Sequence, residues 1–143
     1  MNQVLSSDIL EAQFGPTELK VLYQDGASRI ICARAKAGGQ LLELSFVSFM
    51  TVGAAKFPEV HRTVTAGTSM GKAFRASGVV FKRQERHVDK QALAESFGRQ
   101  FGGQGRATVI AVTILAGPDE TPYAEILEIY SPAVSWPQAQ MTQ

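Results

Sequence analysis

The chain has 143 residues, of which 45% are hydrophobic and 19% charged, and its formal net charge at pH 7 is +1. This length suits one domain spanning residues 1–143. The nearly neutral charge argues against a general nucleic-acid-binding surface, and no apolar run approaches the ~20 residues that a membrane-spanning helix needs. The first residues also lack the basic and apolar regions of a signal peptide. We therefore expect a cytoplasmic protein with no nucleic-acid partner and no membrane span.

Cysteine and histidine are too few for the usual metal sites. Cys32 is the single cysteine, which excludes an intrachain disulfide and a cysteine-based zinc site. His61 and His87 are far apart, and each stands beside an arginine, which is typical of solvated positions. Dinucleotide glycine fingerprints and serine-nucleophile signatures are absent as well. We expect neither a metal nor a cofactor.

The first third of the chain predicts a short helix followed by three strands. Asp8 has the character of a helix cap, with Glu11 three residues later as in a capping box. The partly alternating run 19–23 predicts a strand, and the runs 29–34 and 41–49 flank a glycine-rich loop. The last two runs therefore form a predicted hairpin.

The middle of the chain contains a turn that opens a helix. Residues 60–65 are either a short helix or an irregular passage, and Gly67 then breaks the chain before a helical run that includes Ala73 and Phe74. Thr68 or Ser69 can cap this helix by accepting a backbone hydrogen bond. Its free N–H groups can hold a carboxylate or a phosphate, although an ordinary capped helix has the same sequence signal.

The segment after this helix alternates between apolar and charged stretches. Residues 79–81 are strand-like, and the charged cluster 82–86 is typical of a solvated strand end or loop, although one of its arginines can turn inward to an anionic ligand. Residues 89–97 contain good helix formers, and residues 102–105 form a glycine-rich connector.

A second hairpin completes the predicted fold. The β-branched run 107–115 and the run 123–130 flank a turn rich in glycine and proline, and the tail 138–143 is expected to fray. Because tight turns join most strands, we expect an α+β fold with a mainly antiparallel sheet. Short helices would pack on one side of this sheet and enclose a small-ligand pocket.

The last strand carries two glutamates in an apolar setting. Strict alternation puts Glu128 on one face with Ala124 and Ile126, and Glu125 on the other face with Tyr123 and Leu127. If both faces are partly covered, at least one carboxylate lies in a low-dielectric place where its pKa rises and proton transfer becomes possible. The alternative is an edge strand whose glutamates reach water.

Two arginines lie in the first hairpin strand. Arg29 and Arg34 stand at the ends of the apolar run 30–33, and by parity they point to opposite faces of the sheet. The planar fork of arginine is suited to a carboxylate ligand. An arginine, a helix N-terminus and a desolvated glutamate together fit a small dianionic or dicarboxylic ligand with one proton to move.

The sequence resembles the chorismate pyruvate-lyase family and its relatives, the small-ligand sensing domains of some transcription regulators. Four short motifs carry the resemblance in the same order: residues 8–14 at the N-terminal helix, 38–42 at the first hairpin turn, 69–72 at the central helix start, and 127–132 at the last strand. In the last motif Glu128 stands four residues before Pro132, as the catalytic glutamate of the family does.

The resemblance implies a cofactor-free lyase that splits chorismate into 4-hydroxybenzoate and pyruvate. Its catalytic residue would be Glu128, and Arg29 or Arg34 would hold a substrate carboxylate. The substrate would also meet the backbone amides of Met70 and Gly71, and Ile9 or Leu10 would line the pocket.

The chain departs from the family pattern in two places, and both bear on function. The segment before Arg29 is more than ten residues shorter than in typical lyases, which leaves the choice between Arg29 and Arg34 open, and Met70 lacks the preceding proline. The alternative function is a domain of the same fold that binds or senses an aromatic carboxylate without cleaving it. Because no helix-turn-helix precedes residue 8, we favour the enzyme. The oligomeric state does not follow from the sequence.

Overall fold

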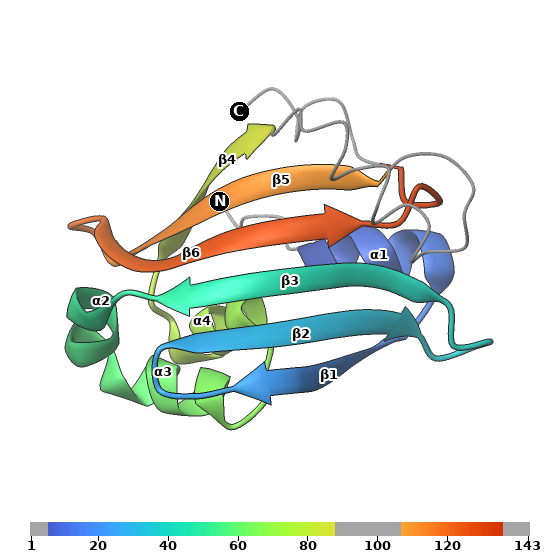
Figure 1. The fold of residues 1–143 in the computed structure, drawn as a ribbon. Helices are drawn as coiled ribbons and strands as arrows, with labels where there is room; N and C mark the ends of the chain where they lie inside the picture. The colour runs from blue at the N-terminus through green and yellow to red at the C-terminus, as the bar shows by residue number, and fades with distance from the viewer. Residues whose placement is uncertain (1–5, 88–106, 136–143) are drawn as a thin grey trace.

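The computed structural model describes residues 6–87 and 107–135 and shows an antiparallel sheet with short helices behind it (Figure 1). In chain order, its elements are α1 (Ser6–Phe14), β1 (Thr17–Gln24), β2 (Ser28–Ala35), β3 (Leu41–Phe49), α2 (Thr51–Lys56), α3 (Pro58–Thr65), α4 (Met70–Ser77), β4 (Phe81–His87), β5 (Thr108–Ala116) and β6 (Thr121–Tyr130). The helix, connector and frayed tail predicted for residues 89–97, 102–105 and 138–143 lie outside the described residues.

The six strands form one sheet in the order β1-β2-β3-β6-β5-β4, and every neighbouring pair is antiparallel. The two predicted hairpins are confirmed as β2-β3 and β5-β6, and the α+β class is confirmed with them. The pairing of β3 with β6 joins the two halves of the chain, because it sets Glu43 beside Tyr130 and Ser45 beside Glu128. This pairing brings together the polar residues of the site described below.

The helices cover one face of the sheet, and the main hydrophobic core lies between the two layers (Figure 1). Val64 of α3 and Phe74 of α4 are fully buried in this core. The approach of α2 to β6 requires Gly53, because a Cβ atom there would lie 2.4 Å from the carbonyl oxygen of Pro122. None of the helices in the described ranges is long and apolar enough to cross a membrane.

Several local predictions about the helices need correction. Helix α1 begins at Ser6, so Asp8 lies in the first turn and is not the cap. Helix α2 was not predicted. The open alternative for residues 60–65 resolves as helix α3, which begins at Pro58; proline is well suited to a first helical position because its missing N–H would have no intrahelical partner there.

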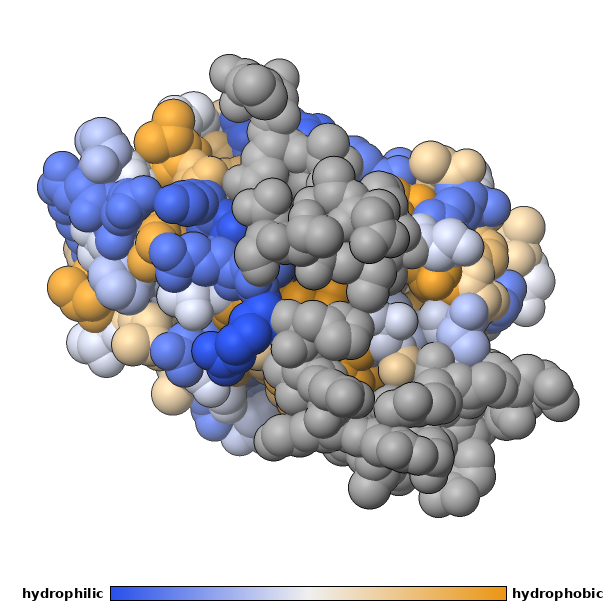
Figure 2. All heavy atoms as spheres, turned by 90° about the horizontal axis from the view of Figure 1, so that it is seen from above, coloured by the Kyte–Doolittle hydropathy of each residue, from blue (hydrophilic) through white to orange (hydrophobic). Residues whose placement is uncertain are grey.

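Strand β4 contradicts the prediction that the cluster 82–86 is a solvated strand end or loop. The strand covers Phe81–His87 and pairs along its whole length with β5. Alternation therefore turns Arg83 and Glu85 to the helix-covered face, where their side chains are 8% and 5% exposed. Lys82 and Arg86 point outward from this edge strand. Figure 2 looks down on this side of the molecule and shows hydrophilic residues there, which discourage edge-to-edge pairing with another sheet.

Strand β6 departs from strict alternation at its beginning. The register with β5 shifts between Ile114 and Leu115, so that Tyr123 has no direct partner in the ladder. Tyr123 therefore packs in the same core as Ala124 and Ile126, and not on the opposite face as predicted. After this bulge the alternation holds: Glu128 is 3% exposed, whereas Glu125 is exposed.

Candidate functional site

A cavity of about 130 Å³ lies between the sheet and the helices. Its floor is apolar and is formed in part by Ile31 of β2, Val47 of β3 and Ile126 of β6. Polar side chains stand at its margins. Of the residues predicted for the site, five line this cavity together: Leu10, Arg29, Met70, Gly71 and Glu128.

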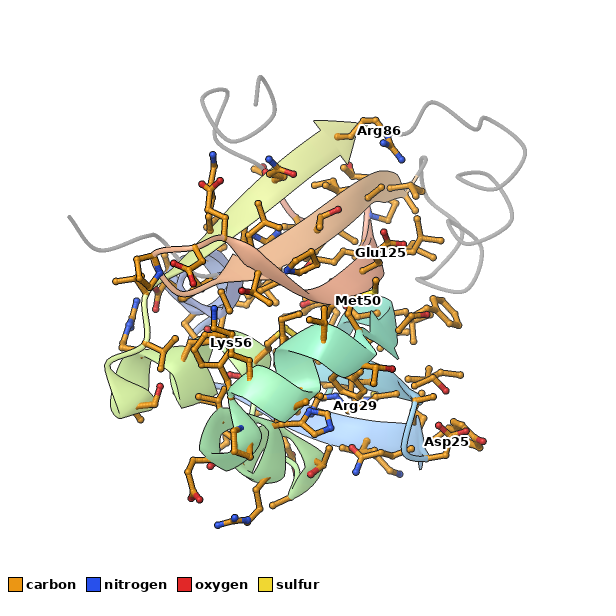
Figure 3. All side chains as sticks on the ribbon, turned by 90° about the vertical axis from the view of Figure 1, so that its left-hand side faces the viewer. Asp25, Arg29, Met50, Lys56, Arg86 and Glu125 are labelled. Carbon is orange, nitrogen blue, oxygen red and sulfur yellow. The ribbon has the colours of Figure 1, made fainter. Side chains whose placement is uncertain are left out.

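Arg29 is a buried cation for which the described residues provide no carboxylate within 4.0 Å. The residue is 1% exposed, and its Nη1 atom donates hydrogen bonds to the carbonyl oxygens of Val64 (2.8 Å) and Thr68 (3.1 Å). Its Nε atom is buried without a hydrogen-bond partner. Burial lowers the pKa of Arg29 from its ordinary value, because removal from water disfavours the charged form. Figure 3 shows Arg29 on the helix side of the sheet.

The start of α4 lies at the same cavity, as the sequence predicted for this turn. Ser69 is the residue before the helix, and it lines the cavity with Met70, Gly71 and Lys72. The predicted side-chain cap is wrong, because the Ser69 hydroxyl makes no capping hydrogen bond and is buried without a partner. The first N–H groups of a helix have no intrahelical acceptor and carry partial positive charge. Arg29 fixes this helix start through its bond to the Thr68 carbonyl.

At another margin of the cavity, Glu128 forms a buried ion pair with Arg83. The two Nη atoms of Arg83 donate to the two carboxylate oxygens of Glu128 at 2.9 and 2.7 Å, and the Tyr130 hydroxyl donates to Glu128 Oε1 at 2.8 Å. Arg83 also donates from Nε to Glu85 Oε1 at 2.9 Å. Burial alone would lower the pKa of Arg83, but the charge of Glu128 raises it well above its ordinary value. The arginine that turned inward thus meets protein carboxylates.

Glu43 is a second buried carboxyl group beside this ion pair. It is 7% exposed, and the Ser45 hydroxyl donates to its Oε2 atom at 2.5 Å. Burial, and after it the negative charge of Glu128, raises the pKa of Glu43 to about 7. A carboxyl group with this pKa can exchange its proton near neutral pH.

The remaining predicted residues lie elsewhere. Arg34 is exposed and donates to the Gly39 carbonyl oxygen at 3.0 Å. Ile9 is buried but does not line the cavity. Glu125 lines a separate, open depression together with Gln84 and Arg86. Figure 3 shows Glu125 on the side of the sheet away from the helices.

Prediction from the sequence missed Glu43 and did not single out Arg83. A sequence signal was present for Glu43, which interrupts the otherwise apolar start of a predicted strand, but not for Arg83, because residues 82–86 are all polar or charged. Neither residue could be placed in the site without the strand register, because Arg83 and Glu128 are 45 residues apart and belong to strands separated by β5.

An aromatic cluster packs behind Arg29. The Arg29 guanidinium carbon lies 6.0 Å from the centre of the Phe49 ring, and the His61 Nδ1 and Tyr123 Oη atoms are 2.8 Å apart. Burial, and after it the charge of Arg29, lowers the pKa of His61. His61, which is partly exposed, thus also takes part in packing. In the described part of the chain, no three His, Cys, Asp or Glu side chains gather as metal ligands would.

Comparison with known proteins identifies the fold. No protein-family model matches the sequence, and no curated protein matches it. Among solved structures, PhnF from Mycobacterium smegmatis is similar with a TM-score of 0.53 and 12% identity over 94% of this chain, which spans 66% of the PhnF chain. The chain has a chorismate lyase-like fold. A more distant similarity, with a TM-score of 0.46 and 11% identity over 82% of this chain and 87% of the other, is to the ligand-binding domain of a protein from Bordetella bronchiseptica assigned to the GntR family of transcriptional regulators. We base no conclusion on this second match.

Proposed function

We propose that this domain binds a small aromatic carboxylic acid in the cavity, with the ligand carboxylate against Arg29 and the start of α4. The observation that carries the proposal is the burial of Arg29 without a carboxylate partner in the described residues. An unpaired buried charge costs several kcal/mol, and an anionic ligand would offset this cost. The proposal treats residues 1–143 as one ligand-binding domain.

Three features of the cavity support this assignment. The unpartnered Nε atom of Arg29 and the unpartnered hydroxyl of Ser69 are donors that the protein itself leaves unused. The N–H groups at the start of α4 favour an anion at the same place. The apolar floor formed by Ile31 and Val47 suits the body of a ring, because ligand pockets combine apolar walls with a few directed polar groups.

The test is a binding titration with 4-hydroxybenzoate, followed by calorimetry and by the melting temperature. Arg29→Gln should weaken binding by at least ~30-fold, because truncation of one partner of a buried charge pair typically costs 2 kcal/mol or more. Arg34→Gln is the matched control on the same strand and should bind as the wild type does. Undiminished binding by Arg29→Gln, or the absence of any binding at millimolar concentration, would refute the proposal.

A second candidate function is the elimination of pyruvate from chorismate, and the raised pKa of Glu43 is the observation that favours it. A carboxyl group with a pKa of about 7 is suited to proton transfer near neutral pH. Glu128, the residue that the family resemblance selects, is engaged by Arg83 and Tyr130. In this mechanism Glu43 would exchange the proton, and Glu128 would orient the Glu43 carboxyl group.

Incubation of the protein with chorismate separates the two functions. The lyase reading requires equal amounts of 4-hydroxybenzoate and pyruvate, with a rate that falls by orders of magnitude in Glu43→Gln or Glu128→Gln and not in the exposed control Glu125→Gln. If 4-hydroxybenzoate binds but neither product forms, the domain is a binding domain.

A further inference from the structure

The buried charges that line the cavity are segregated, and Lys72, a further cation of the lining, is about half exposed and pairs with Glu11. Arg29 stands apart as a cation without a carboxylate partner in the described residues, whereas Arg83 faces Glu128 and Glu85 and also influences Glu43. The Arg83 guanidinium thus interacts with three carboxyl groups, those of Glu43, Glu85 and Glu128. The part of the cavity around Glu43 and Glu128 has excess negative charge whenever Glu43 is ionised.

The carboxyl groups in and beside this part of the cavity are buried. Glu43 and Glu128, which line the cavity, are 7% and 3% exposed. Glu85, which bonds to Arg83 but is not among the lining residues, is 9% exposed, and its second oxygen is buried without a hydrogen-bond partner. Because the guanidinium of Arg83 already donates hydrogen bonds to Glu128 and Glu85, it is not available to a second ligand carboxylate. A dicarboxylic ligand, which the sequence suggested, would bring its second carboxylate to carboxyl groups and be repelled.

The strand register sets the distance between the two charged regions. Arg29 pairs with Val47, which lies four residues from Glu43 on β3, so the backbone positions are separated by on the order of 14 Å at ~3.4 Å per residue. Both side chains line the cavity and shorten this gap. A ligand with opposite charges at the two ends of one aromatic ring has a suitable length.

We propose that the natural ligand is a zwitterion, with its carboxylate on Arg29 and a protonated amine between Glu43 and Glu128. This inference rests on the proposed function, because it uses Arg29 as the carboxylate site. A zwitterion matches the unpaired cation at one margin and the excess carboxylates at the other, which neither a simple acid nor a dicarboxylic acid does.

Binding of the amine should release a proton from Glu43. The groups that face Glu43 are Ser45 on its own strand, Glu128 and Tyr130 on β6, and Arg83 on β4. Burial, and after it the charge of Glu128, raises the pKa of Glu43 to about 7, and an ammonium group would counteract the effect of Glu128. Below this pH, a cationic group can occupy the site favourably only when Glu43 loses its proton.

The experiment compares 4-(aminomethyl)benzoate with 4-ethylbenzoate, which has nearly the same shape but no amine. Calorimetry at pH 6.5 in buffers of different ionisation enthalpy gives the affinity and the number of protons released. We expect the zwitterion to bind about tenfold more tightly, as a charge-assisted hydrogen bond permits, and to release a large fraction of one proton, because Glu43 is mostly but not fully protonated at this pH. In Glu43→Gln the preference and the proton release should disappear, whereas Glu125→Gln should retain both.

The wild type alone provides a second test that does not depend on any variant's folding. Its affinity for the zwitterion should rise from pH 5.5 to pH 8, while its affinity for 4-ethylbenzoate should not. If both acids bind equally well, or the simple acid binds better, the zwitterion is excluded while the proposed function stands. Retention of the preference in a folded Glu43→Gln protein would also overturn this role of Glu43. If neither acid binds, both proposals fail.

Discussion

Two buried arginines line the same cavity and have opposite environments. Arg83 makes a bidentate ion pair with Glu128 and a further bond to Glu85, whereas Arg29 bonds only to backbone carbonyl oxygens among the described residues and approaches the Phe49 ring. Protein carboxylates therefore compensate the charge of Arg83, whereas no carboxylate of the described residues compensates the charge of Arg29. The contrast shows that burial alone does not identify a ligand-binding arginine, because what matters is which charge compensates it.

The largest expected effect is on stability, when the ion pair of Arg83 is broken. Arg83→Met should lower the free energy of unfolding by about 3–5 kcal/mol, because it leaves Glu128 buried without its cation. Lys82→Met is the matched control on the exposed side of the same strand and should change it by less than ~0.5 kcal/mol. Urea unfolding at pH 7 measures both. A loss below ~1 kcal/mol in Arg83→Met would show that the pair is not an essential contact.

A smaller effect is expected in the pH dependence of stability. The pKa of Glu43 is raised in the folded state to about 7, above its ordinary value of 4.5, so the folded protein binds one more proton than the unfolded chain between these values. Its stabilisation is complete below about pH 4.5 and is lost as the pH rises to 7. Relative to Glu43→Gln, the wild type should lose on the order of 3 kcal/mol between pH 4.5 and pH 8.

Urea unfolding of both proteins across this pH range measures the difference, and Glu125→Gln is the control with an exposed carboxylate. A constant difference between wild type and Glu43→Gln would mean that Glu43 ionises normally in the folded protein. That result would also remove the proton that the zwitterion proposal requires.

The smallest effect is expected for Arg29 in the absence of a ligand. Arg29→Met should cost less than ~1.5 kcal/mol, because removal of an unpaired buried cation partly offsets the two lost hydrogen bonds to carbonyl groups. The Val64 carbonyl keeps the bond that it accepts from Gly67 N–H. Arg34→Met is the control, and the same unfolding titration applies. A loss of unfolding free energy as large as that of Arg83→Met would show that Arg29 mainly stabilises the packing of β2 against the start of α4.

Much of the fold could be predicted from local sequence. The strand alternation and the glycine-rich turns indicated both hairpins and the antiparallel sheet, because side-chain period and turn chemistry are local properties. The failures occurred where local preference was weak or overruled. The charged cluster 82–86 contains few strand formers, but pairing with β5 makes it a strand, and Gly53 lies in a helix that packs too closely on β6 for any side chain.

The sequence by itself determined some of the individual parts of the site, but not Glu43 or Arg83. The alternation of the last strand separated Glu128 from Glu125, the parity of β2 separated Arg29 from Arg34, and the turn at Ser69 marked a helix start. Only the tertiary structure decided how the charges combine. The register of β3, β6, β5 and β4 pairs Arg83 with Glu128 and places Glu43 beside them. The same arrangement leaves Arg29 without a carboxylate partner among the described residues. Compensation of a buried charge depends on distances between strands that are remote in sequence, and no local pattern encodes those distances.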